Sequence, residues 1–213
     1  MTRKSGLIGM AIVAGLATGG AANAGFVEIA GNLGPGDSFN VVSGFLVQGP
    51  DEVSIGNVDQ AVPFSTGAVG VFATTIELGM RLTDGVDEVN ISIYSDAGGV
   101  PGAALTTTVG TNLPGPNVPE LASFTLDMPF LLDANTNYWI VADADADTEI
   151  VWHHNDIGKT LKAGRSGDPV GPWNISVDAT TPAFRIFGRD VPAPGTVALL
   201  AGAGLAGLRR RRG

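Results

Sequence analysis

Hydrophobic and polar residues alternate along much of the middle of the chain. In the segment 76–82, isoleucine, leucine and methionine occupy every second position, with polar residues or glycine between them. The segments 89–93 and 123–128 alternate in the same way. A period of two sends successive side chains to opposite faces, and it therefore predicts half-buried β-strands. Further strands are predicted at residues 138–142, 150–152 and 184–187.

Turn-forming residues separate these segments. Thr83–Gly85 follows the segment 76–82, and we predict that this turn joins it to the segment 89–93 as a hairpin. Asp96–Gly99, with Pro101 directly after it, predicts another tight loop. Residues 110–120 contain three prolines and predict a longer loop.

The predicted fold class is all-β, an antiparallel β-sandwich of jelly-roll type, because short strands and turns recur and no stretch of the body has the apolar spacing of a capped helix. The domains expected along the chain are a signal peptide at residues 1–24, the β-sandwich at 25–188, a linker with a sorting motif at 189–196, and an apolar helix with an arginine cluster at 197–213. A signal helix and a short apolar helix would thus flank the sandwich.

The first 24 residues have the pattern of a secretory signal peptide. Arg3 and Lys4 form a positive start, and residues 7–16 form a short apolar run. Ala22 and Ala24 are the small residues that signal peptidase requires, so cleavage is expected after Ala24. The alternative is a buried N-terminal helix.

The C-terminus combines a proline-containing motif, an apolar run and a basic cluster. Val191, Pro192 and Pro194 precede an apolar run of 13 residues, Thr196–Leu208. As a helix this run would span roughly 20 Å, less than the ~30 Å of a bilayer core. The basic cluster behind it consists of Arg209, Arg210, Arg211 and Arg212. Such a cluster should stay on the cytoplasmic side of a membrane.

These three features, in this order at the end of the chain, resemble the PEP-CTERM sorting signal of Gram-negative bacteria. The resemblance implies that an exosortase, a membrane-embedded cysteine peptidase, recognises the tail. It also implies transient membrane contact through the termini. Ala193 stands where the family usually has glutamate, and the apolar run is short. The alternative is a tail anchor that is never processed.

Two segments of the body, Val89–Gly102 and Leu132–Val141, are similar to the choice-of-anchor domains of bacteria. The similarity extends over roughly residues 70–188. It implies an extracellular β-sandwich, and it implies no enzymatic activity.

The body of the chain is strongly acidic and the chain has no cysteine. Between residues 25 and 190 there are six basic and 21 acidic residues, so the formal charge is 6 − 21 = −15. Such a surface repels nucleic-acid phosphates, and we therefore expect no nucleic-acid partner. The absence of cysteine excludes disulfides and thiolate chemistry.

Four acidic residues at alternate positions are the sharpest local feature of the body: Asp143, Asp145, Asp147 and Glu149. In an extended chain all four would project to one face, about 6.5 Å apart. Calcium prefers such carboxylate oxygens, and a calcium site is one interpretation, although an EF-hand is excluded by Thr148 at its glycine position. A solvated acidic hairpin tip is the other. No other cofactor is expected.

Trp173, in a loop, is the candidate platform for stacking on a sugar of an extracellular polysaccharide, with a place in the core as the alternative. His153 and His154 should point to opposite faces of a strand. Either could ligate a metal together with Asp156, or the two form an exposed polar pair at a strand end.

The sequence carries none of the common hydrolase, nucleotide-binding or metalloprotease motifs, so the protein is expected not to be an enzyme. The expected function is that of an exported surface or exopolysaccharide-matrix protein of a Gram-negative-type bacterium. One alternative is a secreted carbohydrate-binding β-sandwich module, which calcium would stabilise. A hydrolase with two scattered carboxylates is a further alternative.

Overall fold

The fold is all-β with antiparallel pairing, as predicted. The computed structural model describes residues 26–51, 56–145, 147–167 and 171–191. Its strands are β1 (Phe26–Gly31), β2 (Asn40–Gln48), β3 (Val58–Ser65), β4 (Val71–Asp84), β5 (Val89–Asp96), β6 (Pro101–Gly110), β7 (Glu120–Leu132), β8 (Asn137–Asp143), β9 (Glu149–His154), β10 (Thr160–Ser166), β11 (Asn174–Thr180) and β12 (Phe184–Asp190).

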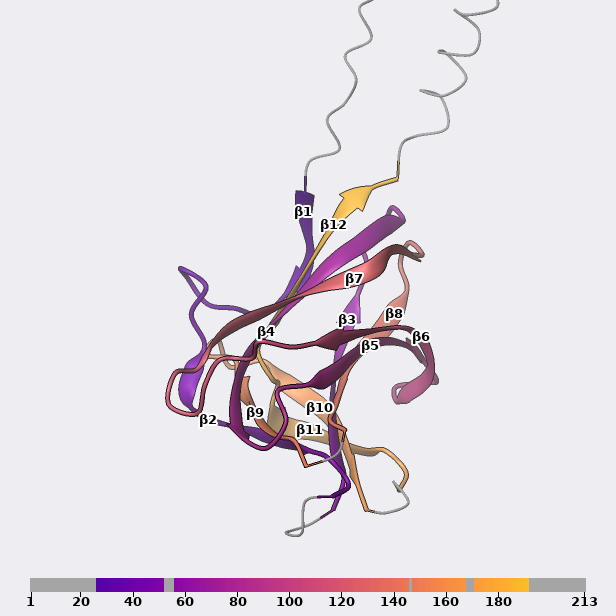
Figure 1. Ribbon diagram of the computed structural model, residues 1–213. Helices are drawn as coiled ribbons and strands as arrows, with labels where there is room; N and C mark the ends of the chain where they lie inside the picture. Colours follow the sequence, from indigo (N-terminus) through magenta and orange to yellow (C-terminus); the bar gives the residue numbers. More distant parts are fainter. Residues whose placement is uncertain (1–25, 52–55, 146, 168–170, 192–213) are drawn as a thin grey trace, which may run out of the picture.

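The strands form one antiparallel sheet that curls around a core (Figure 1). Its main path runs β1-β12-β4-β9-β2-β3-β8-β5-β6. β7 pairs with β4, β10 pairs with β3, and β11 pairs with β10. The Thr108 hydroxyl of β6 donates to the Thr125 carbonyl of β7 at 3.0 Å, so strands from distant parts of the path meet again.

Alternate residues of eight strands pack into one hydrophobic cluster inside the curl. Ile76 and Leu78 of β4, Ile91 of β5, Ile140 of β8 and Ile186 of β12 are all fully buried in it. Burial of apolar area on this scale is the main force that holds such a fold together.

The predicted hairpin between segments 76–82 and 89–93 is wrong, although both segments are strands. β4 pairs with β7, β9 and β12, whereas β5 pairs with β6 and β8. The turn at Gly85 has φ +82°, and its backbone passes so close to Asp147 that a Cβ would lie 1.8 Å from the Asp147 carbonyl oxygen. The Thr148 hydroxyl also donates to the Val86 carbonyl at 2.9 Å. The connection therefore crosses to another part of the sheet instead of reversing beside its own strand.

The other two loops are confirmed. Asp96–Gly99 joins β5 to β6 as a hairpin, and the Asp96 carboxylate accepts the Gly99 amide at 3.1 Å from each oxygen. Gly98 and Gly99 have φ of +77° and +90°, which side chains with a Cβ rarely adopt. Residues 111–119, between β6 and β7, form no strand.

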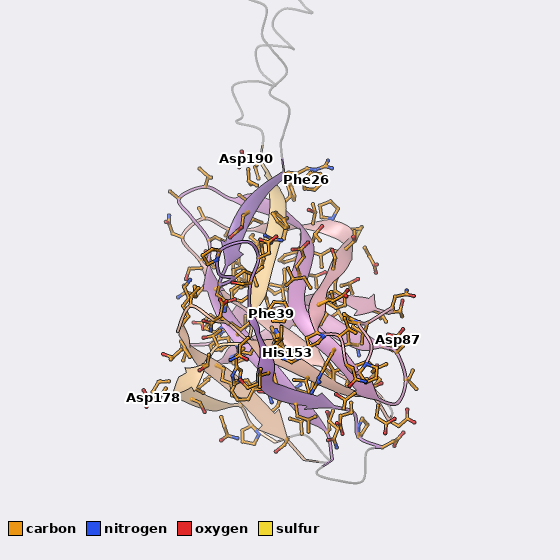
Figure 2. The ribbon with its side chains drawn as sticks, turned by 90° about the vertical axis from the view of Figure 1, so that its left-hand side faces the viewer. Phe26, Phe39, Asp87, His153, Asp178 and Asp190 are labelled. Carbon is orange, nitrogen blue, oxygen red and sulfur yellow. The ribbon has the colours of Figure 1, made fainter. Side chains whose placement is uncertain are left out.

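The described chain begins and ends at the same end of the molecule. Phe26 of β1 pairs with Arg189 of β12, and Figure 2 places Phe26 beside Asp190. The expected signal peptide, the linker beyond Val191 and the tail helix lie outside the described residues, as do Ala22, Ala24, Pro192, Pro194 and Arg209–Arg212. In the part of the chain that is described, no helix has the length and apolar character needed to cross a bilayer.

Candidate functional site

β8 is buried on both of its faces, and its second face leads to the candidate site. Tyr138, Ile140 and Ala142 enter the main core. The residues between them, Trp139 and Val141, form a second cluster on the opposite face. We call this the outer cluster; it also contains Ala61 of β3 and Ala163 of β10, with Tyr94, Trp173 and Ile175 packed partly buried against it. The paired strands β10 and β11, which we call the ribbon, supply part of its cover.

A buried ion pair lies beside the outer cluster. Asp59 of β3 and Arg165 of β10 are register partners, and Arg165 Nε donates to Asp59 Oδ2 at 2.5 Å. The Asp59 side chain is 0% exposed and that of Arg165 is 24% exposed. The other oxygen, Asp59 Oδ1, is buried and has no hydrogen-bond donor among the described residues. A buried acceptor without a donor is costly, so this atom calls for an explanation.

Asp143, the last residue of β8, lies within hydrogen-bonding range of Asp59. Burial raises the pKa of Asp143 to about 7, and the charge and hydrogen bond of Asp59, followed by the charge of Asp145, act in the same direction. Arg165 acts in the opposite direction. Burial and the neighbouring carboxylates thus favour the neutral form of Asp143.

Trp173 and Tyr94 complete the surroundings of the ion pair. The guanidinium carbon of Arg165 lies 4.5 Å from the centre of the Trp173 ring, a cation–π contact. Trp173 is half-buried, and its ring contacts both Arg165 and the outer cluster. The ring is therefore not a free platform for a sugar. Burial raises the pKa of Tyr94, which Arg165 opposes.

The four acidic residues predicted as a calcium site do not share one extended face. β8 ends at Asp143 and β9 begins at Glu149, with a loop between them. Asp145 and Asp147 are exposed, and Asp145 Oδ2 accepts a hydrogen bond from Asn90 at 2.7 Å. Asp143 is turned instead toward Asp59. Among the described residues, no three acidic or histidine side chains are grouped so as to hold a metal ion. The calcium site stays a prediction.

The two histidines are not an exposed pair. His153 is 0% exposed; its Nδ1 lies 3.1 Å from the Asn40 carbonyl and its ring contacts Phe39 (Figure 2). His154 is half-buried against Phe45, with Nδ1 3.1 Å from the Ser43 hydroxyl. Burial lowers the pKa of both histidines. Their different partners agree with the expectation that they point to opposite faces, and the polar-pair interpretation is wrong because both rings pack on phenylalanine.

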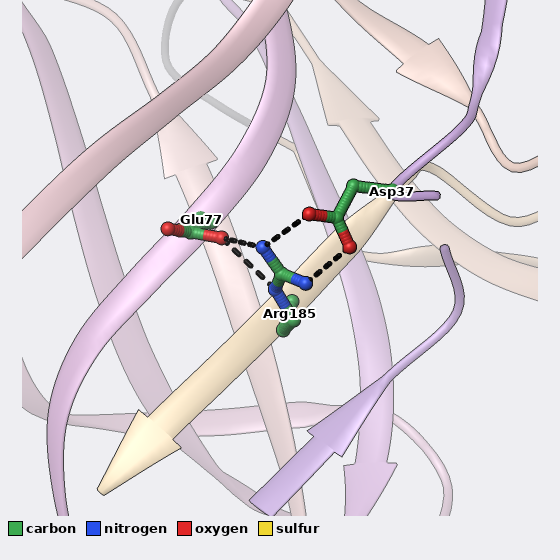
Figure 3. Close-up of polar contacts among 3 residues, drawn as sticks. All are labelled: Asp37, Glu77 and Arg185. Atoms are coloured by element: carbon green, nitrogen blue, oxygen red, sulfur yellow. Dashed lines mark hydrogen bonds and ion pairs between the residues drawn. The ribbon is translucent and has the colours of Figure 1, made fainter. Parts of the chain in front are cut away.

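A second ion cluster lies over β4 and β12 (Figure 3). Arg185 donates to Glu77 Oε2 at 2.6 and 2.9 Å and to both oxygens of Asp37 at 2.5 and 3.3 Å. Burial lowers the pKa of Arg185, but the hydrogen bonds to Glu77 and Asp37 outweigh it, so that the pKa is raised. Arg185 thus links Asp37, in the turn before β2, to Glu77 of β4. We therefore assign the cluster a structural role.

Sequence reasoning found Asp143 and Trp173 separately but missed Asp59 and Arg165, which bring them together. Asp59 and Arg165 lie on β3 and β10, two strands that the alternation did not predict. The one available signal was the unusual position of a lone Asp59 between apolar Val58 and the apolar pair Ala61 and Val62.

Comparisons with known families and curated proteins found no match. No model of a known protein family matches the chain, and no curated protein matches it in sequence.

Proposed function

We propose that the protein is an exported, non-enzymatic surface or matrix protein of a Gram-negative-type bacterium. Signal peptidase would remove residues 1–24, and an exosortase-like enzyme would recognise the tail from Val191 to Arg212. The observation that carries the proposal is the pairing of β1 with β12, which brings the two ends of the described chain, from which the predicted membrane-reading segments continue, to one end of the domain.

This arrangement suits processing at a membrane. With both termini at one end, the domain can stand off the bilayer while either segment is inserted. The same end carries a cross-strand row of Leu131, Phe72, Arg189 and Phe26, whose members are register partners across β7, β4, β12 and β1. Leu131 is 47% and Phe26 62% exposed. Exposed apolar residues beside an arginine suit brief contact with a membrane surface.

The charge and the fold support the same proposal. A body with a formal charge of −15 stays soluble and avoids nonspecific association with anionic polymers. We infer that the curled sheet is a jelly-roll-like β-sandwich of the choice-of-anchor type, since the hydrophobic cluster also joins strands that do not pair, as where Phe64 of β3 packs against Phe184 of β12.

A non-enzymatic role is supported by the environment of one carboxylate pair, Asp59 and Asp143. Retaining and inverting glycosidases need two carboxyl groups about 5–10 Å apart with a sugar between them. Asp59 and Asp143 are within hydrogen-bonding range of each other, and Asp59 is fully buried against Arg165. A sugar ring has no room between them.

The test is processing in a host that carries an exosortase, followed by fractionation and intact mass measurement. We expect envelope or matrix material that lacks residues 1–24 and Arg209–Arg212. Replacing Pro192 and Pro194 together by alanine should leave the tail uncut, whereas Pro172→Ala, an exposed loop proline, should change nothing. Recovery of the chain in the cytoplasm with residues 1–24 intact would overturn the proposal.

The alternative function, a carbohydrate-binding module, is favoured by one observation. A hollow of about 210 Å³ on the ribbon is lined by amide, hydroxyl and cationic side chains that suit sugar hydroxyls or uronate groups: Gln60, Lys162, Arg165, Asn174 and Ser176. Binding on a glycan array that is lost in Asn174→Ala, at the lining of the hollow, and kept in Val42→Ala would support this alternative. Equal signals on all sugars would exclude it.

A further inference from the structure

The buried Asp59 carboxylate lies between β10 and β8, two of the strands that pair with β3. Arg165 is its register partner on β10, and the β8 register, continued by one residue beyond Gln60 and Ala142, sets Asp143 opposite Asp59. Arg165 of β10 holds Oδ2, as described above. β8 pairs with the other part of β3, and its last residue, Asp143, reaches the same carboxylate. Oδ1 has no N–H or O–H donor among the described residues. An ionised Asp143 could only repel it, since a carboxylate has no hydrogen to donate.

We propose that Asp59 and Asp143 share one proton, and that this proton, together with Arg165, fastens β8 and β10 to β3. In this carboxyl pair, Asp143 is the neutral acid and donates its O–H to Oδ1 of Asp59. The junction of Asp59, Asp143 and Arg165 is then electrically neutral, and every buried oxygen of Asp59 has a partner. Proton loss leaves two adjacent carboxylates and one guanidinium, and one net negative charge in a buried place.

The surroundings of the pair set the direction of its pH response. Asp143 faces Asp59 from β3, Asp145 from the following loop and Arg165 from β10, and Tyr94 of β5 is electrostatically coupled to Asp143. Two of these are carboxylates and one is a cation. With partial burial in addition, the net result is a pKa of Asp143 raised from 3.8 to about 7.

A raised folded-state pKa of an acid means that the native state keeps a proton that the unfolded chain releases. The stabilisation is fully present below the unfolded pKa near 4 and is lost as the pH rises through about 7. The free energy of unfolding should therefore fall between pH 4 and 7 and then level off. The loss should appear first where the pair is, at the ends of β8 and β10.

The experiment compares the full chain with Asp143→Asn in urea at pH 5, 6, 7 and 8. Asparagine can donate its amide N–H to Asp59 Oδ1 at every pH. The two proteins should therefore be similar at pH 5, and the variant more stable at pH 8, with a change of about tenfold or more in the ratio of their unfolding constants. Asp147→Asn, an exposed position in the adjoining loop, is the matched control and should show a constant ratio.

A second measurement does not depend on the variant. Carbon-13 NMR of the aspartate carboxyls in the wild-type chain should give a titration of Asp143 close to pH 7. A midpoint below pH 5, or a stability ratio that is the same at pH 5 and pH 8, would overturn the proposal. A third result would also overturn it. If added calcium removed the loss of stability at pH 8, and EDTA brought the loss back, the pair would be a cation site.

Discussion

Both faces of β8 are buried, but against different kinds of side chain. On one face, Tyr138, Ile140 and Ala142 meet apolar residues from many strands. On the other, Trp139 and Val141 are just as buried, but they belong to a smaller cluster with charged and acidic groups beside it: Asp59, Asp143 and Arg165. The first face is held by apolar contacts that do not titrate. The second depends in part on charges and on one proton.

The difference teaches where this fold can respond to its surroundings. The main core draws its buried residues from eight strands, so opening it should disturb most of the sheet. The outer cluster is covered in part by the ribbon, which among the described residues pairs with the rest of the sheet through four register partners of β3, Val58–Ala61. A change of protonation there can loosen one region and leave the core intact.

The largest effect should come from the main core. Ile140→Ala removes a fully buried side chain and leaves a cavity, and it should lower the free energy of unfolding by about 3–4 kcal/mol. Urea unfolding should give the same loss at pH 5 and at pH 8. A loss that changes with pH would mean that the two faces are coupled and would break the comparison.

Asp59→Asn should have the next largest effect, about 2–3 kcal/mol, because it leaves Arg165 partly buried without its counter-charge. It also removes the partner that raises the pKa of Asp143. Unfolding in urea should then depend less on pH between 5 and 8 than in the wild type. Asp178→Asn, at an exposed position of β11 (Figure 2), is the matched control and should be neutral within about 0.5 kcal/mol.

The sequence predicted an all-β, antiparallel fold and most of the strands of the main core, because alternation is strongest where one face is apolar and the other polar. It failed for β3, which carries Pro63 and is buried on both faces, and for β10, whose residues are largely polar. It also failed in strand pairing, since β4 and β5 are neighbours in the chain but not in the sheet. Those failures hid the site: Asp59 and Arg165 meet 106 positions apart, and no local pattern encodes such a contact.

Trp173→Ala should cost less, about 1–2 kcal/mol, since the ring is only half-buried and its main partners are the outer cluster and Arg165. Hydrogen exchange corrected for intrinsic rates should speed up in β10 and β11 and stay unchanged in β4 and β12. Faster exchange in all four strands would mean that the ribbon and the core unfold as one unit.

The smallest effect is expected at Asp37, the exposed member of the ion cluster over β4 and β12. The Asp37 side chain is 56% exposed, so water screens its ion pair with Arg185. Asp37→Asn should therefore cost about 0.5 kcal/mol or less, and added salt should reduce that cost further. The cost should also be the same at pH 5 and pH 8, as measured by urea unfolding. If Asp37→Asn instead cost as much as Asp59→Asn, burial of the carboxylate would not explain the difference in strength between the two ion pairs.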